Sequence, residues 1–217
     1  MTRKLPKTRD IKRRPPSLIP KKKILVICEG RNTEPTYIKN FSADKKHNLV
    51  ECKTIDGIGS PKTIVDKAIA EKKLLDRNAK KSGNSFDGVY EIWCMSDRDE
   101  HPRMREEMQR AKDNGLEYVL SNPCFELWGY LHYAQNDAPT HRHDMQRKLS
   151  GVMNGYDHNH GAIFNYKDMN ENGSYEDAVK RAEELIRRRL EENEPNGDPS
   201  TNMHDLLHSI EELSRKK

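Results

Sequence analysis

The chain has 217 residues, of which 33% are hydrophobic and 34% charged, and its formal net charge is +4. This length fits one large domain, or one domain with a helical extension. No apolar run is long enough to span a bilayer, and no secretory apolar region follows the basic start, so we expect a cytoplasmic protein without membrane contact. The four cysteines are widely spaced without a C-x-x-C pair, which is typical of buried free thiols in a reducing compartment.

Charge is distributed unevenly along the chain. Residues 1–23 hold ten of the 39 Lys and Arg residues and one of the 35 acids, so this segment carries +9 and the rest carries −5. Residues 1–22 are also punctuated by proline and poor in apolar residues, which predicts a disordered basic tail. Such a tail is either an electrostatic arm for nucleic acid or a solvated extension, and both interpretations stay open.

Elements in the first 134 residues alternate between strand and helix. Short apolar runs are typical of strands buried on both faces, and Ser, Thr or Pro before a periodic segment marks the start of a helix. The alternation predicts an α/β fold of Toprim/Rossmann-like type, with a mostly parallel four-stranded sheet and flanking helices. In chain order, the sequence predicts a strand at 23–28, a helix from 32 or 33, a strand at 49–55, a helix at 61–81, a strand at 90–96, a helix at 102–112, a strand at 116–120 and a helix at 124–133.

This alternation stops after residue 134. Residues 135–175 are rich in Asn, His, Gly and Asp, with one short helix expected around 141–149. An amphipathic helix is expected at about 175–192, and Ser200 or Thr201 is expected to cap a last helix. We therefore expect 23–134 to form the core and 135–217 to pack on it as an irregular segment with C-terminal helices. The apolar stripes of the 61–81 and 175–192 helices are expected to include Ile64, Ala68, Leu74, Leu75, Ala178, Ala182, Leu185, Ile186 and Leu190.

Acidic residues follow the first and third expected strands. Glu29 ends the first strand, and Asp97 and Asp99 end the third, where their spacing points both carboxylates to one side of an extended chain. In open parallel sheets, ligands bind beyond the carboxyl ends of the strands, and carboxylate oxygens are preferred ligands of Mg²⁺ and Mn²⁺. The sequence thus predicts a site for one or two such ions. The alternative is that these acids only cap the next helix or form turns.

The same stretches resemble known families. An apolar strand followed by Glu29–Gly30, and a later one followed by Asp97-x-Asp99, resembles the Toprim domain of topoisomerases, DnaG-type primases and OLD-type nucleases. More closely, residues 28–37 (CEGRNTEPTY) together with residues 121–128 (SNPCFELW) resemble the RloB-like family. Topoisomerase and primase activities need additional domains that this length does not provide.

The resemblance to the RloB-like family implies a Mg²⁺- or Mn²⁺-dependent nuclease that acts in prokaryotic antiviral or restriction-associated defence with an AAA-type ATPase partner. It implies that Glu29 is a general acid/base or metal ligand and that Asp97 and Asp99 hold the metal. It also places Asn122 and Glu126 near the site, where Glu126 either binds metal, orients a water or caps the backbone. DNA or RNA as the target stays open, and so does assembly into a homo-oligomer.

Basic side chains must offset the acids if nucleic acid is to bind. The candidates lie in or just after the motif loops, and each of them can also be plain surface charge. They are Arg31, Arg98, Arg103 and Arg105, with Asn122 as a further nucleic-acid contact.

The sequence also bears on other possible functions. A nucleic-acid-sensing or ATPase-regulating module without catalysis stays open, whereas a D-x-D glycosyltransferase leaves Glu29 unexplained. The pairs His141/His143 and His158/His160 are candidates for structural zinc, but no cysteine lies nearby. The sequence contains no G-x-x-x-x-G-K-[ST] loop and no G-x-S-x-G elbow, so any ATP hydrolysis would belong to a partner.

Overall fold

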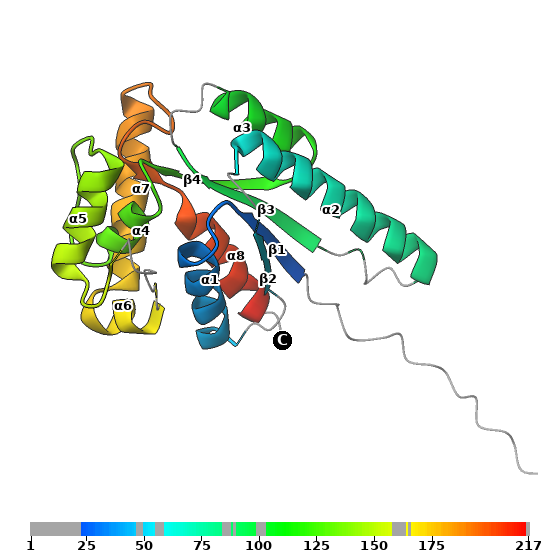
Figure 1. Ribbon diagram of the computed structural model, residues 1–217, viewed down its shortest axis with the longest axis horizontal. Helices are drawn as coiled ribbons and strands as arrows, with labels where there is room; N and C mark the ends of the chain where they lie inside the picture. The colour runs from blue at the N-terminus through cyan, green and yellow to red at the C-terminus, as the bar shows by residue number, and fades with distance from the viewer. Residues whose placement is uncertain are drawn as a thin grey trace, which may run out of the picture.

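The structure is a computed structural model, and it describes residues 23–46, 50–54, 59–83, 88, 90–98, 103–157, 164 and 166–215. The expected basic tail and Asp99 lie outside the described residues. Figure 1 labels most of the elements, which are β1 (Lys23–Cys28), α1 (Thr33–Asp44), β2 (Val50–Thr54), α2 (Pro61–Ser82), β3 (Tyr90–Asp97), α3 (Met104–Asp113), β4 (Glu117–Asn122), α4 (Glu126–Leu131), α5 (Arg142–Val152), α6 (Tyr166–Asn172), α7 (Tyr175–Glu191), β5 (Ser200–Thr201) and α8 (Met203–Arg215).

The strands form one mixed sheet in the order β2-β1-β3-β4-β5. The first four are parallel to their neighbours, as expected, and β5 runs antiparallel to β4. The prediction of four strands was therefore wrong by one. The fifth strand is two residues long, too short to show an alternating pattern, and it is held by tertiary contacts: the hydroxyls of Ser121 and Thr201 are 2.8 Å apart, and Asn202 Oδ1 accepts from the Leu120 N–H at 2.8 Å.

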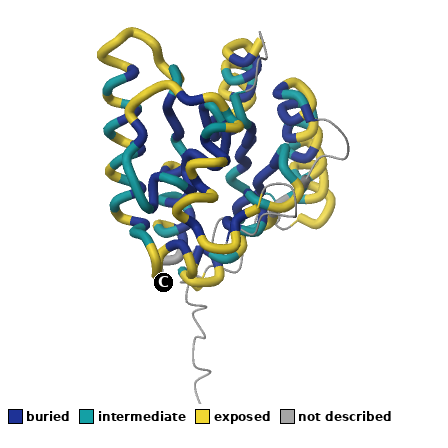
Figure 2. Tube along the Cα trace, turned by 60° about the vertical axis from the view of Figure 1, so that its left-hand side comes forward, coloured by how far each residue is buried: buried dark blue, intermediate teal, exposed yellow. Residues whose placement is uncertain are grey.

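Helices cover both faces of the sheet (Figure 1). On one face, α2 and α3 pack against alternate residues of the central strands, including Leu25, Ile27 and Cys94. On the other face, the intervening residues Val26, Met95 and others pack against α1 and the helices that follow β4. Figure 2 shows the consequence: buried residues run along the central strands, and exposed residues lie on the outer sides of the helices.

Residues on both sides of position 134 share one hydrophobic cluster. It includes Phe41 from α1, Trp128 from α4, Leu149 from α5, Leu185 from α7 and Ile210 from α8, each with no exposed surface. Fully burying one such side chain contributes about 1.5–3 kcal/mol. The C-terminal helices therefore supply much of the core on the α1 side of the sheet.

Most predicted helices are present with boundaries shifted by a few residues. Ser60 caps α2 through a reciprocal capping box with Thr63, and Ser174 caps α7. Helix α6 was missed, because its seven residues are too few to show a helical period. Two residues of the expected apolar stripes are exposed rather than buried: Leu74 is 44% exposed on α2, and Leu190 is 57% exposed on α7.

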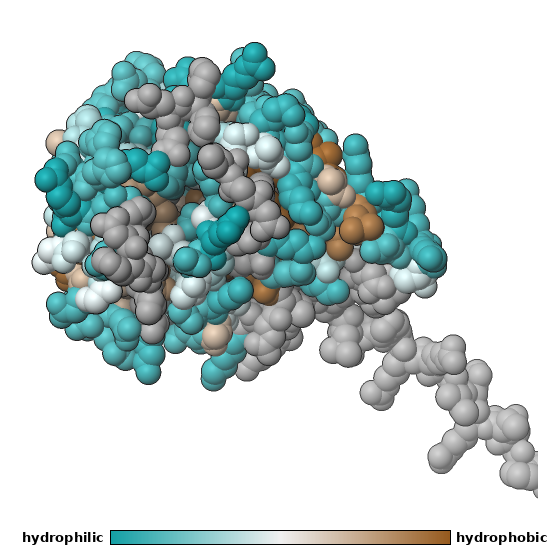
Figure 3. Space-filling view, viewed as in Figure 1, coloured by the Kyte–Doolittle hydropathy of each residue, from teal (hydrophilic) through white to brown (hydrophobic). Residues whose placement is uncertain are grey.

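The surface is largely polar. The face seen in Figure 3 is mainly hydrophilic, with only scattered hydrophobic residues. None of the helices within the described residues is long and apolar enough to cross a membrane. The three cysteines whose side chains are described, Cys28, Cys94 and Cys124, are buried free thiols, as the sequence predicts.

Candidate functional site

The carboxyl ends of β1 and β3 meet at the point where the sheet reverses its order. The chain passes from β1 to β2 on one side, and then returns to place β3 on the other side of β1. Both neighbours are parallel to β1, so all three strands end at the same edge. Loops leave this point in opposite directions, which opens a crevice where ligands bind in sheets of this kind.

Asp97 is the last residue of β3 and lies at this crevice. Its Oδ1 accepts a hydrogen bond from the Phe125 N–H at 2.9 Å, and its Oδ2 lies 3.6 Å from Nη2 of Arg142. Only 17% of the side chain is exposed. The backbone contact links the end of β3 to the start of α4, so the carboxylate is held in place by the fold rather than by its own loop.

Glu29 follows β1 directly and is half-buried. Its N–H donates to the Met95 carbonyl at 3.2 Å, which extends the pairing of β1 with β3 by one residue. The backbone of Gly59 lies against it, since a Cβ built on Gly59 would be 3.1 Å from Glu29 Cγ. Glycine just before the N-cap of α2 therefore leaves room for the Glu29 side chain.

Two further carboxylates come from helix N-termini. Glu34 lies in the first turn of α1 and Glu126 is the first residue of α4, and they are 5% and 4% exposed. The hydroxyl of Thr33 donates to Glu34 Oε2 at 2.5 Å, and the hydroxyl of Tyr156 donates to Glu126 Oε1 at 2.8 Å. A helix N-terminus favours an acid, which partly offsets the cost of burying these groups.

The four carboxylates interact electrostatically. Burial raises the pKa of Asp97 well above its usual range, the negative charges of Glu34, Glu126 and Glu29 raise it further, and Arg142 opposes them. The pKa of Glu34 is also raised, mainly by burial and additionally by Glu126, against the lowering effect of the Thr33 hydrogen bond. Like charges brought together in this way favour either proton uptake or a bound cation.

The donor chemistry fits a hard divalent cation, but the geometry does not yet form a complete ligand set. Carboxylate oxygens are the ligands that Mg²⁺ and Mn²⁺ prefer. Within the described ranges, no three His, Cys, Asp or Glu side chains have the mutual spacing of a metal site. Asp99, the expected third ligand, is outside those ranges. The expected set of Glu29, Asp97 and Asp99 therefore stays a prediction.

The other predicted residues lie apart from the carboxylates or on the surface. Arg98 and Asn122 line a cavity of about 190 Å³ beside α3, together with Arg105. The Asn122 amide donates to the Asn196 carbonyl at 2.8 Å. Arg31 and Arg103 are exposed. This cavity adjoins the carboxyl end of β4, and the binding of nucleic acid by its arginines stays a prediction.

The expected zinc site is only half described. The rings of His141 and His143 lie 5.1 Å apart at the start of α5, whereas His158 and His160 lie outside the described residues. His141 Nδ1 caps the helix by accepting from the His143 N–H. Helix capping accounts for His141 without a metal.

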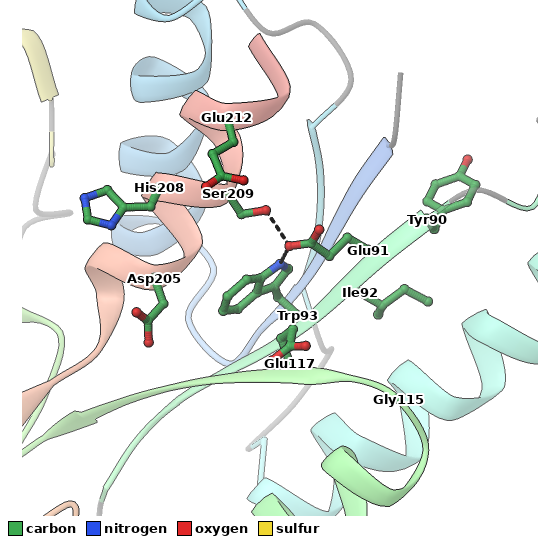
Figure 4. A pocket seen from close by; sticks show the side chains of 10 residues that line it. All are labelled: Tyr90, Glu91, Ile92, Trp93, Gly115, Glu117, Asp205, His208, Ser209 and Glu212. Carbon is green, nitrogen blue, oxygen red and sulfur yellow. Dashed lines mark hydrogen bonds between the residues drawn. The ribbon is translucent and has the colours of Figure 1, made fainter. Parts of the chain in front are cut away.

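A larger cavity, of about 430 Å³, lies far from this site, at the amino ends of β3 and β4 (Figure 4). Glu91 is on its wall but accepts hydrogen bonds from Trp93 Nε1 and the Ser209 hydroxyl. Glu117 and residues of α8 complete the lining, including Asp205, His208 and Glu212. Since ligands of parallel sheets bind at the carboxyl ends, we place the functional site at Asp97 and not here.

Three residues at the site were missed by the sequence analysis. Glu34 had a usable signal, because an acid in the first turn of the helix after β1 lies next to the strand ends. Arg142 and Tyr156 had none, because they follow the predicted core and are brought to the carboxylates only when α5 packs against α4. The C-terminal segment thus contributes to the site as well as to the core.

Gly30 leaves the space that the Glu34 carboxyl occupies. A Cβ on Gly30 would lie 2.5 Å from Glu34 Cδ and closer still to both carboxylate oxygens. We expect Gly30→Ala to lower the free energy of unfolding by about 1–3 kcal/mol, since Glu34 is buried and has little room to move. Urea unfolding measures this. In a Glu34→Ala background the same change should cost about 0.5 kcal/mol or less, because the clashing group is absent; equal costs in both backgrounds would contradict the contact.

The Tyr156 hydroxyl stabilises the buried Glu126. We expect Tyr156→Phe to lower the free energy of unfolding at neutral pH by about 1–3 kcal/mol, because a buried carboxylate oxygen loses its donor. The matched control is Tyr130→Phe, on half-buried Tyr130 of α4, with an expected change within about 0.5 kcal/mol. Equal stability of the two variants in urea would show that the hydroxyl does not support Glu126.

The comparisons with known proteins agree with the motifs. The model of the family described as RloB-like protein matches residues 24–210, which extend from β1 into α8. No curated protein and no solved structure matches the chain. The family match covers the strands, the four carboxylates, Arg142 and Tyr156, well over half of the sequence. The chain therefore belongs to the RloB-like family.

Proposed function

We propose that this protein is a Mg²⁺- or Mn²⁺-dependent nuclease that hydrolyses phosphodiester bonds in nucleic acid. The observation that carries the proposal is the convergence of Glu29, Glu34, Asp97 and Glu126 at the switch point of the sheet, where burial and mutual repulsion raise the pKa of Asp97. Acids held together against their repulsion are costly for a fold. A bound divalent cation would offset this repulsion. A reaction that uses the cation would explain why the carboxylates are held together.

The residues have separable roles in this proposal. Glu29 and Asp97, with Asp99, would hold the metal, which when bound stabilises charge on the attacking and leaving oxygens of an in-line displacement. Glu126, oriented by Tyr156, accepts a proton from the attacking water. Glu34, whose pKa is raised, holds a proton that it can return to the leaving oxygen.

The wider setting is proposed on the resemblance. The strand–Glu and strand–Asp-x-Asp motifs support a Toprim-type site related to that of OLD-type nucleases. Membership of the RloB-like family supports a role in antiviral or restriction-associated defence with an AAA-type ATPase partner. The buried free thiols Cys28, Cys94 and Cys124 support a reducing, cytoplasmic location.

The test is cleavage by purified protein. Wild type is incubated with Mg²⁺ or Mn²⁺ and mixed single- and double-stranded DNA and RNA, with and without an AAA-type ATPase as the proposed partner, and with EDTA as the metal-free control. We expect cleavage that EDTA abolishes and that Asp97→Asn reduces by about 100-fold or more. Asp113→Asn, which changes an exposed acid of α3, controls for the charge change and for contaminating nucleases. Equal cleavage by wild type and Asp97→Asn would reject the proposal.

A non-catalytic, nucleic-acid-sensing module is the second candidate. It is favoured by the contacts that Asp97 makes within the protein, since its carboxylate accepts from the Phe125 N–H and lies 3.6 Å from Arg142. Under this alternative the fold would dock on an ATPase and regulate it. Normal defence activity in a Glu29→Gln/Asp97→Asn double variant would favour this function over the nuclease.

A further inference from the structure

An acidic site that acts on nucleic acid needs a cation from the chain itself. The four carboxylates repel a phosphodiester. The positive charge of a divalent ion that they share mainly compensates their own negative charge. Proteins bind phosphate most effectively through arginine, whose planar fork donates two parallel hydrogen bonds. The question is which arginine lies close enough to the carboxylates.

Arg142 is in that position. It is the first residue of α5, and its Nη2 lies 3.6 Å from Asp97 Oδ2. The Arg142 side chain is 35% exposed, against 17% for Asp97. Arg142 is therefore the more exposed member of the pair, and solvent reaches it more readily than Asp97.

Its place on α5 is unfavourable for the helix. The N-terminus of a helix carries partial positive charge, so a cation in the first turn costs a few tenths of a kcal/mol or more. Asp144 supplies the acid that the first turn favours, and it pairs with Arg147. Arg142 turns instead toward a carboxylate on β3, so the needs of α5 do not explain it.

The pair with Asp97 is also loose. Charge-assisted hydrogen bonds between guanidinium and carboxylate are about 2.7–2.9 Å long, and the contact here is 3.6 Å. Of the other arginines near the sheet edge, Arg98 and Arg105 line the cavity beside α3, and Arg31 and Arg103 are exposed. A contact of this length leaves room for a phosphate oxygen to replace the carboxylate as the partner of the guanidinium.

We propose that Arg142 is the phosphate-binding residue of this site, and that it rests on Asp97 until substrate arrives. This inference rests on the proposed nuclease function. When Asp97 serves as a metal ligand, its charge is compensated by the ion, and the guanidinium turns to the phosphodiester. The C-terminal segment thereby supplies the residue that recognises the substrate's charge.

The experiment measures binding separately from cleavage. Labelled single-stranded phosphorothioate DNA and RNA, which resist hydrolysis, are titrated with the full-length protein in Mn²⁺ at several salt concentrations. We expect Arg142→Gln to weaken binding by about 10-fold or more and to reduce the slope of log affinity against log salt by about 0.7, the loss of one phosphate contact. Mn²⁺ affinity, measured by calorimetry, should stay the same or increase, because a positive charge next to the ligands is removed.

The matched control is Arg147→Gln. It makes the same charge change five residues further along α5, on a side chain that is 80% exposed, and it should alter oligonucleotide affinity by less than about 2-fold. Arg142→Lys keeps the charge and guards against misfolding of the first variant. It should retain the salt slope and lose several-fold in affinity, because lysine lacks the fork.

Several results would overturn the inference. Equal oligonucleotide affinity of Arg142→Gln and Arg147→Gln would do so, and so would full affinity in Arg142→Lys. Loss of Mn²⁺ binding in Arg142→Gln would show that Arg142 only positions Asp97. A wild type that binds oligonucleotides through Arg142 yet cleaves none would support this inference and reject the nuclease. If wild type cleaves nucleic acid and Arg142→Gln has the same KM as wild type, this inference is rejected and the proposed nuclease function is retained.

Discussion

Saturating Mn²⁺ is expected to raise the Tm of the wild-type protein by about 5–10 °C, and Asp97→Asn is expected to remove this shift together with metal-dependent cleavage. A ligand at 100 times its Kd stabilises the folded state by about 2.7 kcal/mol, and each kcal/mol moves the Tm of a chain of this size by about 2–4 °C. The effect is specific to Asp97 because its carboxylate lies at the centre of the converging acids. Differential scanning calorimetry with and without Mn²⁺ measures the Tm of wild type and of Asp97→Asn.

The same substitution is expected to stabilise the protein when no metal is present. The pKa of Asp97 is higher in the folded than in the unfolded state. The folded protein therefore binds more protons between these two pKa values, and its stability falls as the pH rises through that interval. Asparagine does not ionise, yet its Oδ1 can still accept from the Phe125 N–H. Asp97→Asn should thus match wild type at acid pH and exceed it at neutral pH.

The control for both effects is Asp113→Asn, at an exposed position on α3. It should leave the Mn²⁺ shift intact and change stability by no more than about 0.5 kcal/mol at any pH. A metal-free Asp97→Asn protein that is less stable than wild type at neutral pH would mean that the carboxylates do not repel one another as described. A retained Mn²⁺ shift in that variant would place the metal elsewhere.

The largest loss of stability is expected from Trp128→Ala. Trp128 lies on α4 with no exposed surface, and its ring contacts Tyr37, His132 and Tyr175 at centroid distances of 6.3, 5.2 and 6.4 Å. Removing a buried tryptophan costs about 3–5 kcal/mol through lost burial and the cavity left behind. A loss of this size should lower the Tm by about 10 °C or more. Because α4 also carries Glu126, we expect the site to be disordered in this variant.

Leu190→Ala is the matched control for this loss. It truncates a large apolar residue that is 57% exposed on α7, so its cost should stay within about 0.5 kcal/mol. Chemical unfolding of both variants, followed by far- and near-ultraviolet circular dichroism, measures the difference in their free energies of unfolding. Similar costs for the two substitutions would show that α4 is not anchored through Trp128.

Local patterns were sufficient for the elements themselves. The apolar run of β1 and the capping residue of α2 depend on neighbours within a few positions, so the sequence predicts them directly. Glu29 and Asp97 were placed at strand ends for the same reason. Glu126 was found through the motif resemblance, since nothing in its spacing distinguishes it from an ordinary acid in a first helical turn.

Contacts between distant segments decided the rest. The two residues of β5 form a strand only because β4 presents an open edge to them, and Leu190 stays exposed because no neighbouring element covers it. Glu34 enters the site because the strand order β2-β1-β3 brings the start of α1 beside the end of β3.

The sequence by itself determined an α/β chain of the RloB-like family with acids at two strand ends. Only the tertiary structure determined which side chains complete the site, because residues 97, 126, 142 and 156 lie far apart in the chain. Arg142 and Tyr156 reach Asp97 and Glu126 through packing alone. The burial that this packing produces is also what raises the pKa of Asp97, a property that no local pattern of residues contains.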